Sequence, residues 1–228
     1  MDLLTLAKGP LLQWSTVVLI AGILWRVVGV ALLRDSKSLS EPRHRDAWKG
    51  LRLMATRSVP IKEFASTTVF VEVTGWVFHI AFFVALLFYL PHVLFFEDVF
   101  KGLLGVNFSD VAHVSWPHLP GDIIYFCGVV SIAGLIVVLV HRLMNPVLRL
   151  ISTLDDYISW LVTFAPVLTG MLAYSHIGGR YETLLAVHIL SVEALMICFP
   201  FGKLMHTFTM FVLRGLTGAL FERKGAAL

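Results

Sequence analysis

Uninterrupted apolar runs divide the chain into five segments, each long enough to cross a bilayer as a helix. A transmembrane helix needs about 20 apolar residues, and the runs that reach this length are residues 11–33, 64–96, 123–140, 157–177 and 183–213. Stretches that are richer in polar residues separate them. The pattern predicts an all-α membrane protein with five transmembrane helices, forming a single integral-membrane domain over residues 1–228.

The composition agrees with this prediction. Hydrophobic residues make up 57% of the 228 residues and charged residues only 14%, against about a quarter charged in soluble domains. The two cysteines, Cys127 and Cys198, lie in different runs and are too few for a disulfide framework, a zinc site or an iron–sulfur cluster. Five helices and their loops leave no room for a separate catalytic domain.

The loop charges predict an orientation. The segment from Arg34 to Lys62 holds eight basic and three acidic residues, whereas the segment from Glu97 to Asp122 holds one basic and four acidic residues. Because basic loops remain on the cytoplasmic side, we expect the N-terminus outside and the C-terminus in the cytoplasm of a prokaryotic inner membrane. The basic segment has two interpretations, namely binding of anionic lipid or docking of a partner subunit.

Nine histidines stand out in a chain with few other polar residues, and four of them lie deep in the apolar runs. His79 and His92 lie in the second run, and His188 and His206 lie in the fifth. These two helices are predicted to be antiparallel, so depth would pair His79 with His206 and His92 with His188. Two such pairs would suit two haem groups with axial imidazoles. The alternative is four packed histidines that bond to backbone carbonyls or to Glu72 and Glu193.

Straight helices would fit the haem hypothesis poorly. At 1.5 Å per residue, His79 and His92 would be about 20 Å apart, and His188 and His206 about 27 Å apart. His79 and His92 would also point about 140° apart around one helix axis. Pro91 and Pro200 are therefore predicted to kink the two runs.

Other polar residues near the runs each have two interpretations. Lys203 can pair with a haem propionate or extend to the membrane surface. Glu193 can handle protons or make a structural hydrogen bond. The outer segment that contains His113, Trp116 and His118 can line a polar pocket or belong to an aromatic belt.

Three motifs occur in and beside the predicted spans, namely Phe199-Pro-Phe-Gly-Lys-Leu-Met-His, Phe78-His-Ile and His141-Arg-Leu-Met-Asn-Pro. They resemble motifs of the cytochrome b membrane subunits typified by the gamma subunit of respiratory nitrate reductase, with relatives in heterodisulfide reductase and the sulfite-reductase-linked membrane complex. The resemblance covers essentially the whole chain. It implies a dihaem helical bundle in which two non-covalent haem b groups are ligated by the two histidine pairs given above, with a quinone site near the outer haem.

The chain departs from that family at two positions. The second histidine of the second run is expected ten residues after the first, where Tyr89 stands, and His92 follows three residues later. The basic residue that the family has near its quinone site would fall close to Trp116, where neither lysine nor arginine is present. His118, His113 and Trp116 are the quinone-binding candidates that remain.

The interpretation as a whole is an electron-transfer subunit of a respiratory oxidoreductase complex. It would link membrane quinone to a cytoplasmic iron–sulfur partner, which docks on the loop from Arg34 to Lys62 and on the C-terminal tail; no nucleic-acid partner is expected. The chain would not act alone on the terminal substrate. The alternative is a small transporter or proton or cation channel that uses Glu72, Glu193 and the deep histidines.

Overall fold

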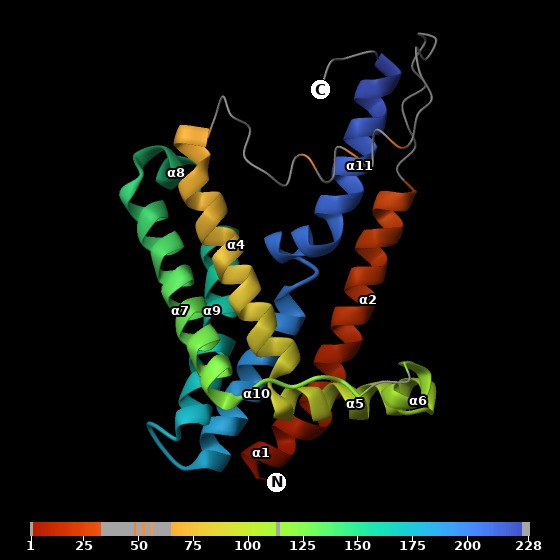
Figure 1. Ribbon diagram of the computed structural model, residues 1–228, viewed down its shortest axis with the longest axis vertical. Coiled ribbons are helices and arrows are strands. Elements are labelled where there is room, and N and C mark those ends of the chain that lie inside the picture. Colours follow the sequence, from red (N-terminus) through yellow and green to blue (C-terminus); the bar gives the residue numbers. More distant parts are fainter. Residues whose placement is uncertain are drawn as a thin grey trace. The chain divides into compact units, whose positions relative to one another are not determined.

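The computed structural model describes residues 2–32, 65–112 and 115–224, together with the isolated residues Trp48, Arg52 and Thr56. Every regular element in these ranges is helical (Figure 1). The chain divides into two compact units. Unit 1 comprises Met1–Val69, Thr153–Val162 and Ile189–Leu228, and unit 2 comprises Phe70–Ser152 and Thr163–His188.

Unit 2 contains most of the long helices. It holds most of α4 (Ala65–Phe88), α5 (Leu90–Leu104), the short α6 (Phe108–Ala112), α7 (Gly121–Met144), α8 (Pro146–Ile151), the larger part of α9 (Leu154–Ser175) and the beginning of α10 (Tyr181–Cys198). Gly128 and Gly134 on α7 allow close helix packing, because an added Cβ would contact Met171 of α9 and Phe78 of α4, respectively.

Unit 1 is formed by both ends of the chain. The first elements are α1 (Leu3–Leu6), a π-helical turn (Ala7–Leu11) and α2 (Leu12–Ala31). The start of α9, the second half of α10, a 3-10 turn (Lys203–Met205) and α11 (His206–Lys224) complete the unit. In Figure 1, α11 continues in the direction in which α10 rises.

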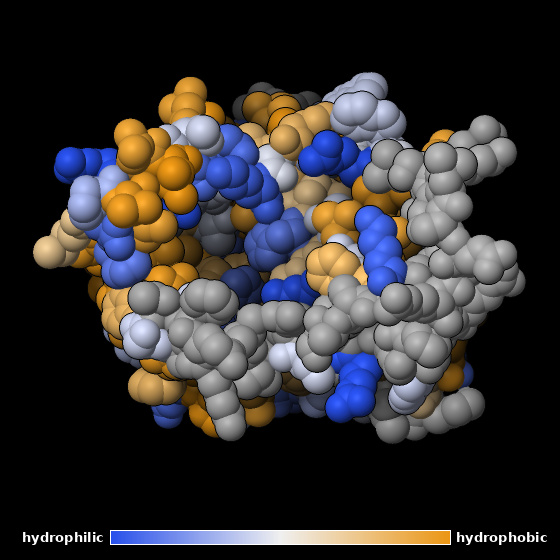
Figure 2. Space-filling view, turned by 90° about the horizontal axis from the view of Figure 1, so that it is seen from above, coloured by the Kyte–Doolittle hydropathy of each residue, from blue (hydrophilic) through white to orange (hydrophobic). Residues whose placement is uncertain are grey.

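Among the described residues, six helices are long and apolar enough to cross a membrane, and they support a multi-pass membrane protein. They are Leu3–Val30, Thr68–Phe88, Gly121–Met144, Leu154–Ser175, Tyr181–Cys198 and Lys203–Phe221. Large hydrophobic side chains such as Trp14, Ile80 and Phe126 are exposed, and Figure 2 shows many hydrophobic residues on the surface. This is the arrangement expected where lipid surrounds a chain.

Five spans are predicted but six candidate helices occur in the described ranges, because the fifth predicted run, residues 183–213, is divided. Helix α10 ends at Cys198, and α11 begins at His206. Pro200 lacks a backbone N–H and disfavours a helical conformation at Phe199, and Gly202 is extended. The sequence predicts a kink at this proline, whereas the structure has a complete interruption of the helix.

The second predicted run, residues 64–96, is also divided. Tyr89 has an extended backbone, with φ −76° and ψ 124°, and Pro91 lies in the first turn of α5. Helix α5 therefore runs across the end of α4 instead of prolonging it (Figure 1). Its other end is closed by Gly105 in the left-handed conformation, whose N–H donates to the Lys101 carbonyl at 2.8 Å.

The buried Pro200 gives a first prediction. A Cβ on Gly22 of α2 would lie 2.5 Å from Pro200 Cβ and Cγ, whereas one on Gly29 of the same helix would meet no described atom within 4 Å. We expect Gly22→Ala to lower the free energy of unfolding by about 1–3 kcal/mol through overpacking. Gly29→Ala should leave it unchanged or slightly higher. Thermal unfolding in detergent measures both, and equal stability of the two variants would contradict the packing.

Candidate functional site

The side chain of His92 lies against the end of α4. A helix leaves its last four carbonyls without intrahelical partners, and in an apolar environment such groups are costly. After the break at Tyr89, the His92 side chain returns to α4, where its Nδ1 lies 3.3 Å from the Ala85 carbonyl oxygen. The ring also makes a backbone hydrogen bond at Leu86. His92 therefore satisfies the exposed end of the helix that precedes it.

Trp116 and Leu119 satisfy the other two carbonyls of this helix end. The Trp116 indole Nε1–H donates to the Leu87 carbonyl at 2.9 Å, and the Leu119 N–H donates to the Phe88 carbonyl at 2.9 Å. The Trp116 ring also packs against Phe108, with centroids 4.9 Å apart. The segment after α6 is thereby fastened to α4.

His92 and His188 lie together in unit 2. Their ring centroids are 6.1 Å apart and their planes differ by 23°. His92 belongs to α5 and His188 to α10. The predicted outer pair is therefore brought together from two helices.

The spacing of this pair fits a shared iron. An imidazole centroid lies about 1 Å from its own Nε2, and imidazole–metal bonds are about 2 Å long, so two rings facing one ion have centroids about 6 Å apart. An offset stack of two packed rings has a similar spacing. The geometry thus suits both the haem interpretation and the packed-histidine interpretation.

The Nδ1 contacts of these rings indicate which of the two ring nitrogens carries the proton. The Thr169 hydroxyl donates its single proton to the Ala165 carbonyl at 2.7 Å, so its oxygen accepts from His188 Nδ1, 3.4 Å away. The Ala85 carbonyl likewise accepts from His92 Nδ1. The tautomer with the proton on Nδ1 and the lone pair on Nε2 satisfies both contacts, and it is the usual arrangement of a metal-ligating histidine.

Burial favours the neutral form of the His92 ring. This residue lies beyond the candidate span Thr68–Phe88, and its removal from water lowers the pKa of its imidazole below the usual value. A lower pKa favours the neutral ring at physiological pH. The neutral ring is the form that ligates a metal.

The other two predicted ligands have the same local arrangement. His79 Nδ1 lies 2.7 Å from the Gly75 carbonyl oxygen, and His206 Nδ1 lies 2.9 Å from the Lys203 carbonyl oxygen. Each nitrogen therefore donates to a carbonyl. His79 belongs to unit 2 and His206 to unit 1, and their pairing stays a prediction.

A cluster of tyrosines beside the outer pair was not predicted from the sequence. Tyr89 packs edge-on against His92 at 5.1 Å and also against Tyr174 at 5.7 Å. Tyr174 packs against Tyr125 at 5.9 Å. A Cβ on Gly121 would lie 2.5 Å from the Tyr174 hydroxyl oxygen. The cluster joins α7, α9 and the break after α4. The only sequence signal for it is the presence of tyrosines near the ends of the helices.

The predicted quinone residues have different environments. Trp116 is held by the hydrogen bond and ring contacts described above, whereas the neighbouring His118 is exposed. His113 lies outside the described residues. The predicted partner-docking segment from Arg34 to Lys62 also lies outside them, apart from its three isolated residues.

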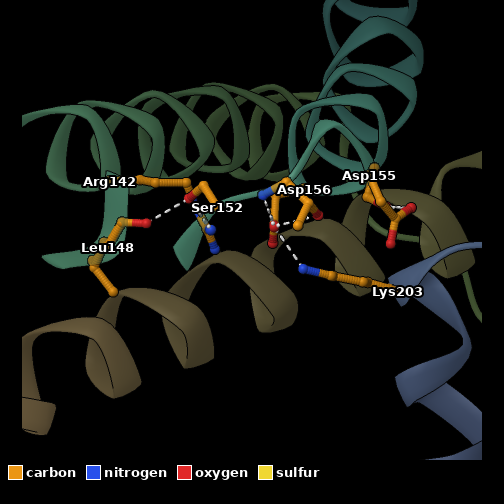
Figure 3. Close-up of polar contacts among 8 residues, drawn as sticks. Arg142, Leu148, Ser152, Asp155, Asp156 and Lys203 are labelled. Atoms are coloured by element: carbon orange, nitrogen blue, oxygen red, sulfur yellow. Dashed lines mark hydrogen bonds and ion pairs between the residues drawn. The ribbon is translucent and has the colours of Figure 1, made fainter. Parts of the chain in front are cut away.

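Lys203 contacts a carboxylate of its own unit. Its Nζ lies 2.6 Å from Asp156 Oδ2, and the Asp156 side chain is only 7% exposed (Figure 3). The same oxygen accepts from the Thr153 N–H at 2.9 Å, which closes the first turn of α9. Asp156 therefore caps the start of α9. It also gives the Lys203 ammonium a protein partner where a haem propionate was predicted.

Glu193 is the most isolated buried polar group in the described part of the chain. It is 4% exposed, and its Oε1 has no hydrogen-bond partner among the described residues. Glu72, on α4, is half-buried. Within the described ranges, no group of three or more metal-ligating side chains occurs, so a compact all-protein metal site is absent there.

Comparisons with known proteins do not identify an activity of the chain. No family model matches it, and no solved structure matches it. A protein of Nitratidesulfovibrio vulgaris strain Hildenborough is 29% identical in an alignment over 215 residues that covers 92% of this chain and 89% of that protein. Its name states no function. The similarity therefore extends over nearly the whole of both chains.

The hydrogen bond of Trp116 gives a second prediction. Trp116→Phe would leave the Leu87 carbonyl without its donor, and we expect the free energy of unfolding to fall by about 1–3 kcal/mol. Trp14→Phe is the matched control, because Trp14 is 70% exposed. Unfolding in detergent measures both. A loss no larger than that of the control would contradict the capping role.

The ion pair gives a third prediction. Lys203→Met, Asp156→Asn and the double variant form a thermodynamic cycle that measures the coupling energy of this ion pair. If Lys203 pairs with Asp156, the coupling should be measurable but at most about 1 kcal/mol, because half of the lysine side chain is exposed. The more exposed pair formed by Arg180 and Glu182 should show no coupling. Zero coupling between Lys203 and Asp156, with a changed haem potential in Lys203→Met, would favour the propionate role.

Proposed function

We propose that the chain is a dihaem cytochrome b subunit of a quinone-linked respiratory oxidoreductase complex in the inner membrane of a prokaryote. It would transfer electrons between membrane quinone and a cytoplasmic iron–sulfur partner, in either direction. The proposal rests first on the convergence of His92 and His188 at 6.1 Å from two separate helices. The apolar helices and the Phe-Pro-Phe-Gly-Lys-Leu-Met-His motif that ends at His206 support it.

Four histidines would provide the axial ligands in this proposal. His92 and His188 would hold the outer haem b, and His79 and His206 would hold the inner one. Bound haem iron would supply one-electron redox chemistry. The Nδ1 contacts of all four rings support this assignment, because they orient each imidazole and direct its lone pair to Nε2.

The remaining roles follow from the predicted orientation. Quinone would bind near the outer pair, with His113, Trp116 and His118 as candidates, and Lys203 would contact a propionate of the inner haem. The iron–sulfur partner would dock on the segment from Arg34 to Lys62 and on the C-terminal tail. Release of quinol protons outside, with electrons moving inward, would build a membrane potential. Quinol turnover in proteoliposomes without charge movement would contradict this last step.

Haem counting tests the proposal directly. We expect a reduced-minus-oxidised visible spectrum and a pyridine haemochrome assay of the purified chain to give two b-type haems per polypeptide. His92→Ala and His188→Ala should remove one and the same haem signal, and His79→Ala and His206→Ala should remove the other. A well-folded chain without haem would overturn the proposal.

A matched control comes from His176. Its Nδ1 also contacts a carbonyl, that of Tyr174 at 3.1 Å, but its backbone is left-handed with φ 55° and it lies in the loop after α9. His176→Asn keeps a residue type that tolerates this conformation and should retain both haems. Loss of both signals in every histidine variant would indicate a folding role instead.

The second candidate function is a small transporter or a proton or cation channel. Glu193 favours it, because a carboxyl group that is 4% exposed with an unpartnered Oε1 is unusual in an apolar helix. A colourless preparation whose proteoliposomes conduct protons or cations, and lose this flux in Glu193→Gln, would support this function. A haem-containing chain without such flux would exclude it.

A further inference from the structure

Helix α9 approaches the His188 ring at Gly170, which has no side chain. A Cβ on Gly170 would lie 3.0 Å from His188 Cε1 and 3.2 Å from its Nδ1. Contacts this short require the neighbour to move, and the neighbour here is a rigid ring. The imidazole therefore lies against the backbone of α9, and a Cβ at position 170 would require the ring to move by a few tenths of an ångström.

The preceding residue of α9 contacts the same ring. Thr169 Oγ1 lies 3.4 Å from His188 Nδ1 and donates its own proton to the Ala165 carbonyl at 2.7 Å. The Pro166 carbonyl is a further backbone partner of the ring. The consecutive residues Thr169 and Gly170 thus contact one imidazole from one helix, the first through a hydrogen bond and the second by leaving space.

We infer that Thr169 and Gly170 are positioning residues for His188, and that they set the orientation and the electron donation of this ligand in the outer haem site. The inference rests on the proposed function and adds two residues to it. An acceptor at Nδ1 makes an imidazole a stronger electron donor to its metal, and loss of such a partner typically costs about 10–100-fold in metal affinity.

Substitutions at Thr169 separate the hydrogen bond from the packing. Thr169→Val keeps the branched shape and removes the hydroxyl acceptor, so that the Pro166 carbonyl remains as the backbone partner of the ring, whereas Thr169→Ser keeps the hydroxyl. We expect Thr169→Val to shift the midpoint potential of the outer haem to a more positive value and to weaken its retention by about tenfold or more. Thr169→Ser should behave as the wild type, and the inner haem should be unchanged in both variants.

Gly170→Ala tests the space beside the ring. We expect it to displace His188 and to remove or broaden the outer haem signal while the inner signal remains. Gly29→Ala is the control, since an added Cβ there meets no described atom within 4 Å, and it should retain both signals. Retention of the inner haem shows that the variant has folded.

The outcomes distinguish this inference from the proposed function. If the wild type holds two haems and Thr169→Val and Gly170→Ala leave the outer potential and content unchanged, the inference is overturned and the proposed function stands. If the wild type holds none, the proposed function is overturned. Nitrogen NMR of isotope-labelled histidine in the haem-free chain then still tests Thr169, because Thr169→Val should reduce the population of His188 with its proton on Nδ1. An unchanged population would overturn the role of Thr169.

Discussion

The carbonyls at the end of α4 are the constraint on which the rest of unit 2 depends. An apolar helix that stops must give its last carbonyls new partners, because lipid provides none. His92 bonds to the end of α4 at Ala85, Trp116 bonds at Leu87 and the Leu119 backbone bonds at Phe88. These donors come from α5 and from the segment after α6. The break at Tyr89 therefore determines where both of these elements lie.

The same hydrogen bond links the fold to the proposed site. His92 donates from Nδ1 to the end of α4, and this contact also orients the ring whose centroid lies 6.1 Å from that of His188. A side chain with two nitrogens can serve the helix end with one and a ligand with the other. The structural interpretation and the haem interpretation of His92 are thus compatible, although the sequence analysis treated them as alternatives.

Much of the architecture could be predicted from the sequence, because the hydropathy of long apolar runs is a strong signal. The all-helical class, the presence of several apolar helices long enough to cross a membrane, and a disturbance of the helix at Pro91 and at Pro200 follow from it. The split of residues 183–213 could not be predicted with the same certainty, since a proline in an apolar run can bend a helix or end it. The partner of Lys203 could not be predicted from the sequence either, because Asp156 is 47 residues away along the chain. Thr169 and Gly170 carry no motif and are identified only by their contacts with His188.

The two breaks also change how the histidine spacing is understood. One break, at Tyr89, lies between His79 and His92, and the other, at residues 199–202, lies between His188 and His206. Separations of about 20 Å and about 27 Å, and a rotation of about 140°, apply only to uninterrupted helices. With a break inside each interval, the orientation of each histidine is set by its own helix and its own carbonyl or hydroxyl contact. The mismatch between the two intervals is therefore not an argument against two separate histidine pairs, and the position of each break between the histidines is what two independently oriented sites in one membrane domain would require.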